Sequence, residues 1–254
     1  MMVGFPTKGP AAVALFEGVP GAHGIVQAAL DGMGQVLADS PVHPRSALAW
    51  AGDFLCCAGT PGPEAARLLR TALQTHHGYW VVYAPGPWRE ALAKVGKFRI
   101  ARRCAFDPAV QPEDGHLRSL LMHMPDGLRF QPIEGKWIAR CREAEWSRDF
   151  VSLYDDAAYA QRGLGVLLVA GDEPVCGASS YVSYPGGIEV QLQTRDDMQG
   201  RGFATLAAAR LILTAHERGM IATWDAANPA SAHIAEKLGY RAAGLYEVAE
   251  LQFG

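Results

Sequence analysis

The chain has 254 residues, 49% of them hydrophobic, which is enough for one large domain or two small ones with a sizeable core. Its 23 basic and 26 acidic residues give a net charge of −3 without long runs of like charge, which argues against a nucleic-acid binder. The chain has no run of 18 apolar residues and no signal-peptide pattern at its start, so we expect no membrane segment.

The first half of the chain alternates strand-like and helical patterns. These patterns predict strands over residues 47–58, 79–83 and 98–106, and helices over residues 63–76 and 87–95. We infer a smaller N-terminal α/β domain over residues 1–124, which ends near a turn-rich stretch. We expect this domain to cover one side of an acceptor cleft or to form the contact of a homodimer.

Three apolar strands, separated by two tight turns, open the second half of the chain. They are predicted over residues 164–170, 175–183 and 188–194, and each turn contains glycine and proline. Consecutive strands joined by tight turns form an antiparallel meander. We assign residues 125–254 to a second domain built on this meander.

A glycine-containing loop follows the third strand and leads into a helix. The loop runs from Gln199 to Ala204 with glycines at 200 and 202, and the helix is predicted over residues 203–217. Glycine lets backbone N–H groups approach an anion, and the helix N-terminus adds its positive dipole end, so the loop suits a pyrophosphate. A dinucleotide fingerprint would need glycine where Thr205 stands. A glycine-rich turn that merely starts a helix remains the alternative.

A second motif lies further along the chain. A strand is predicted over residues 220–224, followed by a helix with Asn228 as its N-cap and Pro229 at its first position. Gly239 suits the left-handed position at the end of this helix. Each of these residues has a structural explanation by itself, but their order after a phosphate loop favours a functional one.

Together these motifs resemble the GNAT superfamily of N-acetyltransferases. The Q/R-x-x-G-x-G/A pattern and the later N-x-x-S/A…G-Y/F pattern appear here as Gln199, Gly202, Ala204, Asn228, Ser231, Gly239 and Tyr240. Residues 187–194, 224–228 and 236–240 are similar to a bacterial subfamily that includes zwittermicin-type resistance acetyltransferases. The resemblance implies an α/β (α+β) fold with a mixed, mainly antiparallel twisted sheet flanked by helices.

The resemblance also implies acetyl-CoA as co-substrate and a set of residues that bind it. Backbone amides would hold the pantetheine at Leu192, Gln193 and Thr194, and the pyrophosphate at Gln199, Gly200, Arg201, Gly202, Phe203 and Ala204. Asn228 and Ser231 would reach the pantetheine from the other side. The pantetheine would lie between strands 188–194 and 220–224, which diverge in this fold.

Glu189 is the candidate general base, since the attacking amine must first lose a proton. On a strand it shares a face with Gln191 and Gln193, so these side chains line an acceptor pocket or form an ordinary solvated face. Family members often carry a tyrosine as general acid where this chain has Ala235. The candidates to replace it are Ser231, His233 and Tyr240, unless the thiolate leaves without an acid or Tyr240 only packs in the core.

The five cysteines include no C-x-x-C pair and are odd in number, which disfavours a disulfide framework and a zinc site. We therefore expect a cytoplasmic protein without a metal. The function expected is N-acetyl transfer from acetyl-CoA to a primary amine of a small molecule, by direct attack in a ternary complex. The alternative is a non-catalytic acyl-CoA-binding module with a sensing or assembly role.

Overall fold

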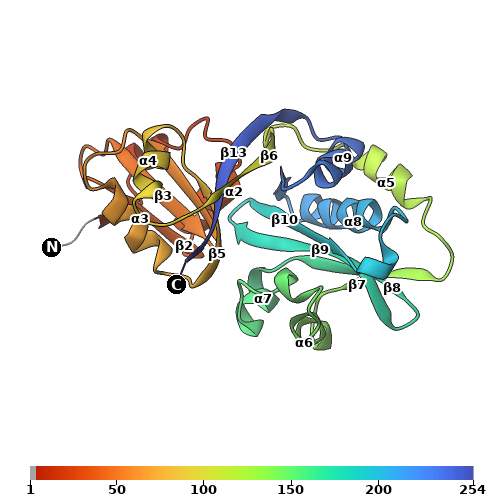
Figure 1. The fold of residues 1–254 in the computed structure, drawn as a ribbon. Helices are drawn as coiled ribbons and strands as arrows, with labels where there is room; N and C mark the ends of the chain where they lie inside the picture. The colour runs from red at the N-terminus through yellow and green to blue at the C-terminus, as the bar shows by residue number, and fades with distance from the viewer. Residues whose placement is uncertain (1–3, 254) are drawn as a thin grey trace. The chain divides into compact units, whose positions relative to one another are not determined.

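The computed structural model describes residues 4–253, which form two compact units (Figure 1). The second unit is Phe106–Ala243, and the first contains the residues before it together with those from Gly244 onward. The division therefore falls after Ala105 and not at residue 124, and the end of the chain belongs to the first unit.

The first unit is built on a mixed sheet whose strands lie in the order β1-β2-β3-β4-β5-β13-β6. These strands are β1 (Phe5–Pro6), β2 (Gly34–Ala38), β3 (Ser46–Ala51), β4 (Phe54–Gly59), β5 (Gly78–Tyr83), β6 (Arg99–Phe106) and β13 (Ala242–Phe253). The helices are α1 (Pro10–Ala14), α2 (Ala22–Leu30), α3 (Ala65–Leu73) and α4 (Pro87–Ala93). The last strand of the chain thus lies inside the sheet, where it pairs antiparallel with β5.

The prediction of one strand over residues 47–58 is wrong, because this run is a hairpin. β3 and β4 pair antiparallel, and a turn at Gly52 and Asp53 joins them. Gly52 has a φ of 58°, a left-handed conformation that glycine adopts without strain. The β3 side chains are buried on both faces, so the run shows no alternation of apolar and polar residues from which a turn could be read.

The second unit contains the predicted meander, which is confirmed. Its sheet has the order β11-β10-β9-β8-β7, with β7 (Leu128–Pro132), β8 (Gly165–Ala170), β9 (Glu173–Tyr184), β10 (Gly187–Thr194) and β11 (Ile221–Thr223). Neighbouring strands are antiparallel except β10 and β11, which are parallel. The prediction of a mixed, mainly antiparallel sheet flanked by helices is confirmed.

Helices cover both faces of this sheet (Figure 1). They are α5 (Asp114–Leu121), α6 (Lys136–Glu143), α7 (Asp156–Arg162), α8 (Phe203–Glu217) and α9 (Pro229–Leu238), with the short 3-10 turns η1 (Arg148–Phe150) and η2 (Asp196–Met198) and the two-residue strand β12 (Asp225–Ala226). α8 packs on β8, β9 and β10, and α5 packs on α8, which places residues 106–124 in this unit. On the opposite face, Phe150 of η1 and Tyr159 of α7 contact β9.

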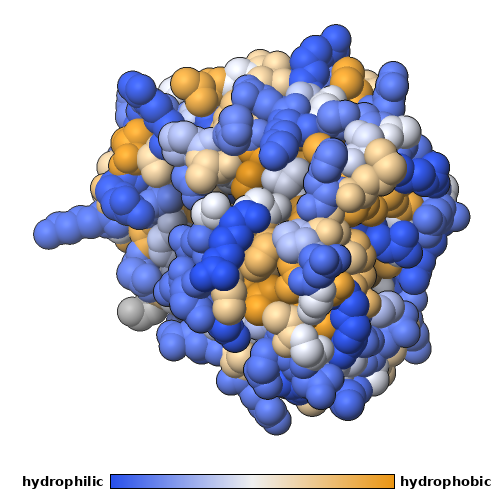
Figure 2. Space-filling view, turned by 90° about the vertical axis from the view of Figure 1, so that its right-hand side faces the viewer, coloured by the Kyte–Doolittle hydropathy of each residue, from blue (hydrophilic) through white to orange (hydrophobic). Residues whose placement is uncertain are grey.

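The surface of the protein is largely hydrophilic on the face that Figure 2 shows, with hydrophobic residues exposed between the polar ones. Among residues 4–253, no helix combines the length and the apolar character needed to cross a lipid bilayer.

Gly177 of β9 lies where a side chain would collide with the layer formed by η1. A Cβ at this position would lie 2.6 Å from the Phe150 ring and 2.9 Å from Leu167. We expect Gly177→Ala to lower the free energy of unfolding by about 1–3 kcal/mol, because a well-packed core cannot absorb the extra methyl group. Thermal unfolding measures this change. Gly115→Ala in α5, where a Cβ would meet nothing within 4 Å, is the control and should not destabilise the protein.

Candidate functional site

The parallel pairing of β10 and β11 is short, and the two strands then separate. Residues Gly187–Glu189 pair with Ile221–Thr223, after which β11 ends while β10 continues to Thr194. Within the described residues, no strand pairs with β10 beyond Glu189 on that side. Backbone groups along this edge of β10 are therefore available to an extended ligand that can form strand-like hydrogen bonds.

A β-bulge marks the point at which β10 leaves β11. Glu189 lies opposite Val182 of β9, but Val190 lies opposite Ser180, so the register passes over Tyr181. A bulge bends its strand and increases the local twist, which redirects the side chains beside it. The bulge and the end of the β11 pairing thus coincide at Glu189.

Glu189 is buried, with 8% of its surface exposed, and its carboxylate contacts a hydroxyl group. Thr223, opposite it in the parallel register, has its Oγ1 2.5 Å from Glu189 Oε2 and 2.9 Å from the carbonyl oxygen of Ile188. Tyr184 and Tyr240 also lie near Glu189, and burial raises the pKa of both phenols, so they stay neutral at physiological pH. The Glu189 carboxyl group therefore lies among neutral hydroxyls.

Two glutamines extend from this carboxyl toward the protein surface. Since β10 has no extra residue, Glu189, Gln191 and Gln193 point to the same face. Gln191 lies opposite Ser179, whose hydroxyl contacts Tyr159, so this is the face that α7 and η1 cover. Gln193 is exposed, and the row thus runs from a buried carboxyl to solvent.

The other face of β10 carries the remaining residues expected near the pantetheine. Leu192 and Thr194 are half-buried, and Thr194 Oγ1 lies 3.1 Å from the thiol of Cys176. Because β9 holds this hydroxyl, the contribution expected from Thr194 would come from its backbone.

The loop before α8 presents a set of backbone donors. Gly200 and Gly202 have φ values of 75° and 78°, and Gly202 is the N-cap of α8, which begins and ends where the sequence predicts. Within the described residues, the N–H groups of residues 200–204 donate to no other group of the chain. A Cβ on either glycine would meet nothing within 4 Å, so the space before the loop is open. These features fit a bound pyrophosphate.

The acidic residues just before this loop are held in local pairs. Arg195 donates to both carboxylate oxygens of Asp197, at 2.6 and 3.0 Å, and these hydrogen bonds lower the pKa of Asp197. The Gln199 side chain donates to Asp196 at 3.0 Å. Asp197 is thus neutralised by its neighbour, while the exposed Arg201 adds positive charge beside the loop.

The start of α9 has the predicted cap. The Asn228 side chain accepts a hydrogen bond from the Ser231 N–H at 2.9 Å, and Pro229 occupies the first helical turn. Gly239 ends the helix in a left-handed conformation with a φ of 107°. The prediction of both helix ends is confirmed, and the amide oxygen of Asn228 is occupied by this cap.

The three candidates for a general acid have different surroundings. The Tyr240 hydroxyl donates to the Ala222 carbonyl of β11 at 2.7 Å and is buried, which matches the alternative that it packs in the core. His233 is exposed on α9. Ser231 Oγ accepts a hydrogen bond from the indole N–H of Trp224 at 3.1 Å. Ala235, one turn after Ser231, is fully buried.

Two polar contacts of this site, made by Thr223 and Trp224, are not predicted by the sequence. Both residues fall in the strand predicted over residues 220–224, and each contacts a candidate catalytic side chain: Thr223 contacts Glu189, and Trp224 contacts Ser231. The feature of the sequence that could have indicated the contact with Glu189 is Thr223 itself, a polar residue in a short predicted strand.

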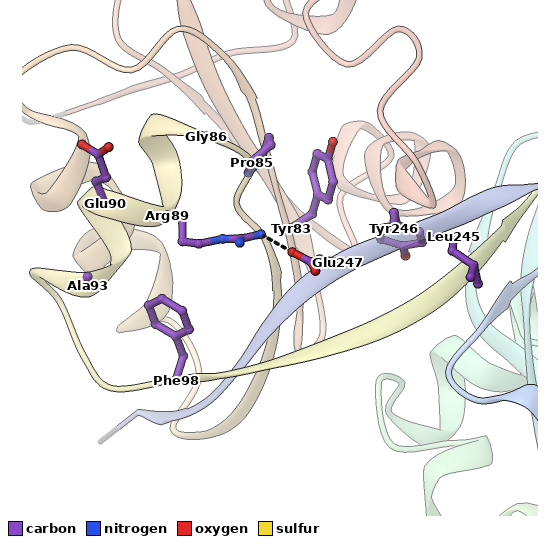
Figure 3. Close-up of a pocket in the computed structure, with 10 residues that line it drawn as sticks. All are labelled: Tyr83, Pro85, Gly86, Arg89, Glu90, Ala93, Phe98, Leu245, Tyr246 and Glu247. Carbon is purple, nitrogen blue, oxygen red and sulfur yellow. Dashed lines mark hydrogen bonds and ion pairs between the residues drawn. The ribbon is translucent and has the colours of Figure 1, made fainter.

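Two hollows lie away from these residues. One, of about 700 Å³, is in the first unit between α4 and the strands β5 and β13, where Arg89 forms an ion pair with Glu247 at 3.0 Å (Figure 3). The other, of about 330 Å³, is in the second unit near Tyr159 and Arg218. Neither hollow is lined by Glu189, Ser231 or the loop before α8.

Comparisons with known protein sequences and structures indicate the family to which the chain belongs. A search of curated protein sequences finds no match. Among solved structures, a GCN5-related N-acetyltransferase-like protein from Streptococcus suis 89/1591 is similar, with a TM-score of 0.81 and 33% identity over 94% of this chain and 96% of that one. A GCN5-related N-acetyltransferase from Kribbella flavida shares the fold, with a TM-score of 0.56 and 18% identity over 98% and 97% of the two chains.

A family model described as GNAT acetyltransferase matches residues 14–249, which is most of the chain and includes parts of both units. The chain belongs to the GNAT acetyltransferase family.

Proposed function

We propose that this protein is an N-acetyltransferase that moves an acetyl group from acetyl-CoA to a primary amine of a small molecule, by direct attack in a ternary complex. The family supports an acyltransferase. The observation that carries the proposal is the end of the β10–β11 pairing at a buried Glu189, on the strand that leads to the donors before α8. Bound acetyl-CoA would supply an activated acyl thioester at this position.

Each part of the site has a separate task in this proposal. The N–H groups at residues 200–204 bind the pyrophosphate, and the edge of β10 beyond Glu189 binds the pantetheine arm. Glu189 accepts the proton that the ammonium group of the acceptor must lose before it attacks. Holding both reactants in one site supplies the proximity that the transfer needs.

Ser231 is our candidate to hold a proton for the leaving sulfur atom. The indole N–H of Trp224 can only donate, so Ser231 Oγ is the acceptor in their hydrogen bond. The hydroxyl proton of Ser231 therefore remains for another acceptor. This orientation supports Ser231 over Tyr240, whose proton is directed to a β11 carbonyl.

The row formed by Glu189, Gln191 and Gln193 favours a polar acceptor. Within that class we propose an amine-bearing antibiotic or amino-acid derivative, in line with the likeness of residues 187–194 to zwittermicin-type resistance enzymes. We also propose that the protein acts in the cytoplasm, where its five cysteines, all free in the structure, would stay reduced.

The alternative of a non-catalytic acyl-CoA-binding module is favoured by Ala235, a buried alanine where many relatives carry tyrosine. In that case acetyl-CoA would bind but no amine would be acetylated. Measuring free-CoA release over a panel of amines distinguishes the two functions.

Ala204→Pro tests the pyrophosphate site. Proline is tolerated in the first turn of a helix but lacks an N–H, so this change removes one donor to the anion. We expect the affinity for CoA, measured by calorimetry, to fall roughly tenfold to hundredfold, because hydrogen bonds to charged groups are strong. Ala204→Ser keeps the donor and should bind CoA as the parent does. Equal affinity in both variants would place the pyrophosphate elsewhere.

Glu189→Gln tests the general base. Glutamine keeps the shape of the side chain but cannot accept the proton, so kcat should fall by about 10²–10⁴-fold while CoA affinity stays within about twofold. Initial rates of CoA release measure kcat. The control is Glu173→Gln, which removes an exposed carboxylate from the same sheet and should leave the rate unchanged. A Glu189→Gln enzyme with full activity would show that another group takes the proton.

Ser231→Ala and Trp224→Phe test the leaving-group step. The first removes the hydroxyl and the second the N–H that orients it, so both should lower kcat by about tenfold or more with a smaller change in the KM for acetyl-CoA. Unchanged kcat in both variants would mean that the sulfur leaves without an acid.

A further inference from the structure

We infer that Thr223 is a positioning residue whose hydroxyl keeps Glu189 hydrogen-bonded both as a carboxylate and as a carboxylic acid. This inference deepens the proposed function and rests on Glu189 as its base. It depends on one juxtaposition: Thr223 Oγ1 lies between the Glu189 carboxyl and the Ile188 carbonyl, within hydrogen-bonding distance of both.

The hydroxyl has one proton and lies beside the Glu189 carboxyl, the Ile188 carbonyl and the Tyr184 phenol. Oγ1 is 2.5 Å from Glu189 Oε2 and 2.9 Å from the Ile188 carbonyl oxygen, and both are acceptors when Glu189 is ionised. In that state the proton goes to the carboxylate, because a hydrogen bond to a charged acceptor is the stronger one. When Glu189 is protonated, its O–H donates to Oγ1, and the Thr223 proton turns to Ile188.

This exchange is what a buried base requires. Glu189 and Thr223 are 8% and 5% exposed, so little water can replace a lost hydrogen bond. When Glu189 takes a proton from the nitrogen of the substrate amine, the Thr223 hydroxyl rotates. No buried oxygen atom then loses a hydrogen bond without gaining another. The proton on Glu189 passes to solvent after the product leaves, so the protein ends in its initial state.

Two ionisable groups that face Glu189 are phenols. Tyr184 comes from β9 and Tyr240 follows α9, and burial keeps both protonated through the working pH range. They add no charge beside Glu189 as it titrates. The Thr223 hydroxyl, in contrast, changes its hydrogen bonds when the Glu189 carboxyl changes its protonation state.

The test compares Thr223→Val, which has nearly the same shape but no hydroxyl, with Thr223→Ser, which keeps the hydroxyl. An infrared titration of the protein without acetyl-CoA follows the carboxyl band, and Glu189→Gln identifies which band belongs to Glu189. We expect the midpoint to move up by about one pH unit in Thr223→Val, because the charged form loses the stronger hydrogen bond. The midpoint in Thr223→Ser should match the parent.

The pH profile of kcat/KM gives an independent readout, and its acid limb should move up in Thr223→Val but not in Thr223→Ser. Thr223→Ala removes the same hydroxyl with less bulk and serves if the valine variant does not fold. Equal infrared midpoints in the parent, valine and alanine proteins would overturn the inference. If no variant acetylates any amine but the midpoint still shifts, the proposed function fails while the role of Thr223 stands.

Discussion

The pairing of β10 with β11 over only three residues on each strand is the constraint on which the site depends. It brings Glu189 opposite Thr223 and then ends, which leaves one edge of β10 open to an extended ligand. A longer β11 would satisfy that edge with protein backbone and remove the place where a pantetheine arm could bind. For the proposed function, the shortness of β11 therefore matters as much as the identity of the candidate catalytic side chains.

The sequence predicted those features that local chemistry determines. The helix α8 was predicted with approximate bounds that the structure matches, because a glycine loop and a terminal glycine mark its ends. The cap at Asn228 was predicted for the same reason. The hairpin of β3 and β4 was missed because both strands are buried. The compact units differ from the predicted domains because the pairing of β13 with β5 joins residues far apart in the sequence.

The candidate site shows the same limit. The loop at residues 199–204 and the face shared by Glu189 and Gln191 follow from glycine chemistry and strand alternation. The contact between Glu189 and Thr223 joins residues 34 apart, and it depends on a parallel register that no local pattern encodes. The hydrogen bond from Trp224 to Ser231 likewise cannot be predicted from the sequence, because it depends on how the two side chains are placed in the fold. Motifs thus indicated a candidate ligand class, and tertiary pairing determined which groups surround Glu189 and Ser231.

The position of β13 inside the first sheet affects how the protein folds during its synthesis. Residues 249–253 lie between β5 and β6 and pair with β5, so the strands before them cannot close into a continuous sheet until residue 253 has been synthesised. Until then β5 presents an open edge of the kind that associates with other chains. A chain that stops before residue 249 would keep this edge of β5 unpaired, which would favour association between truncated copies.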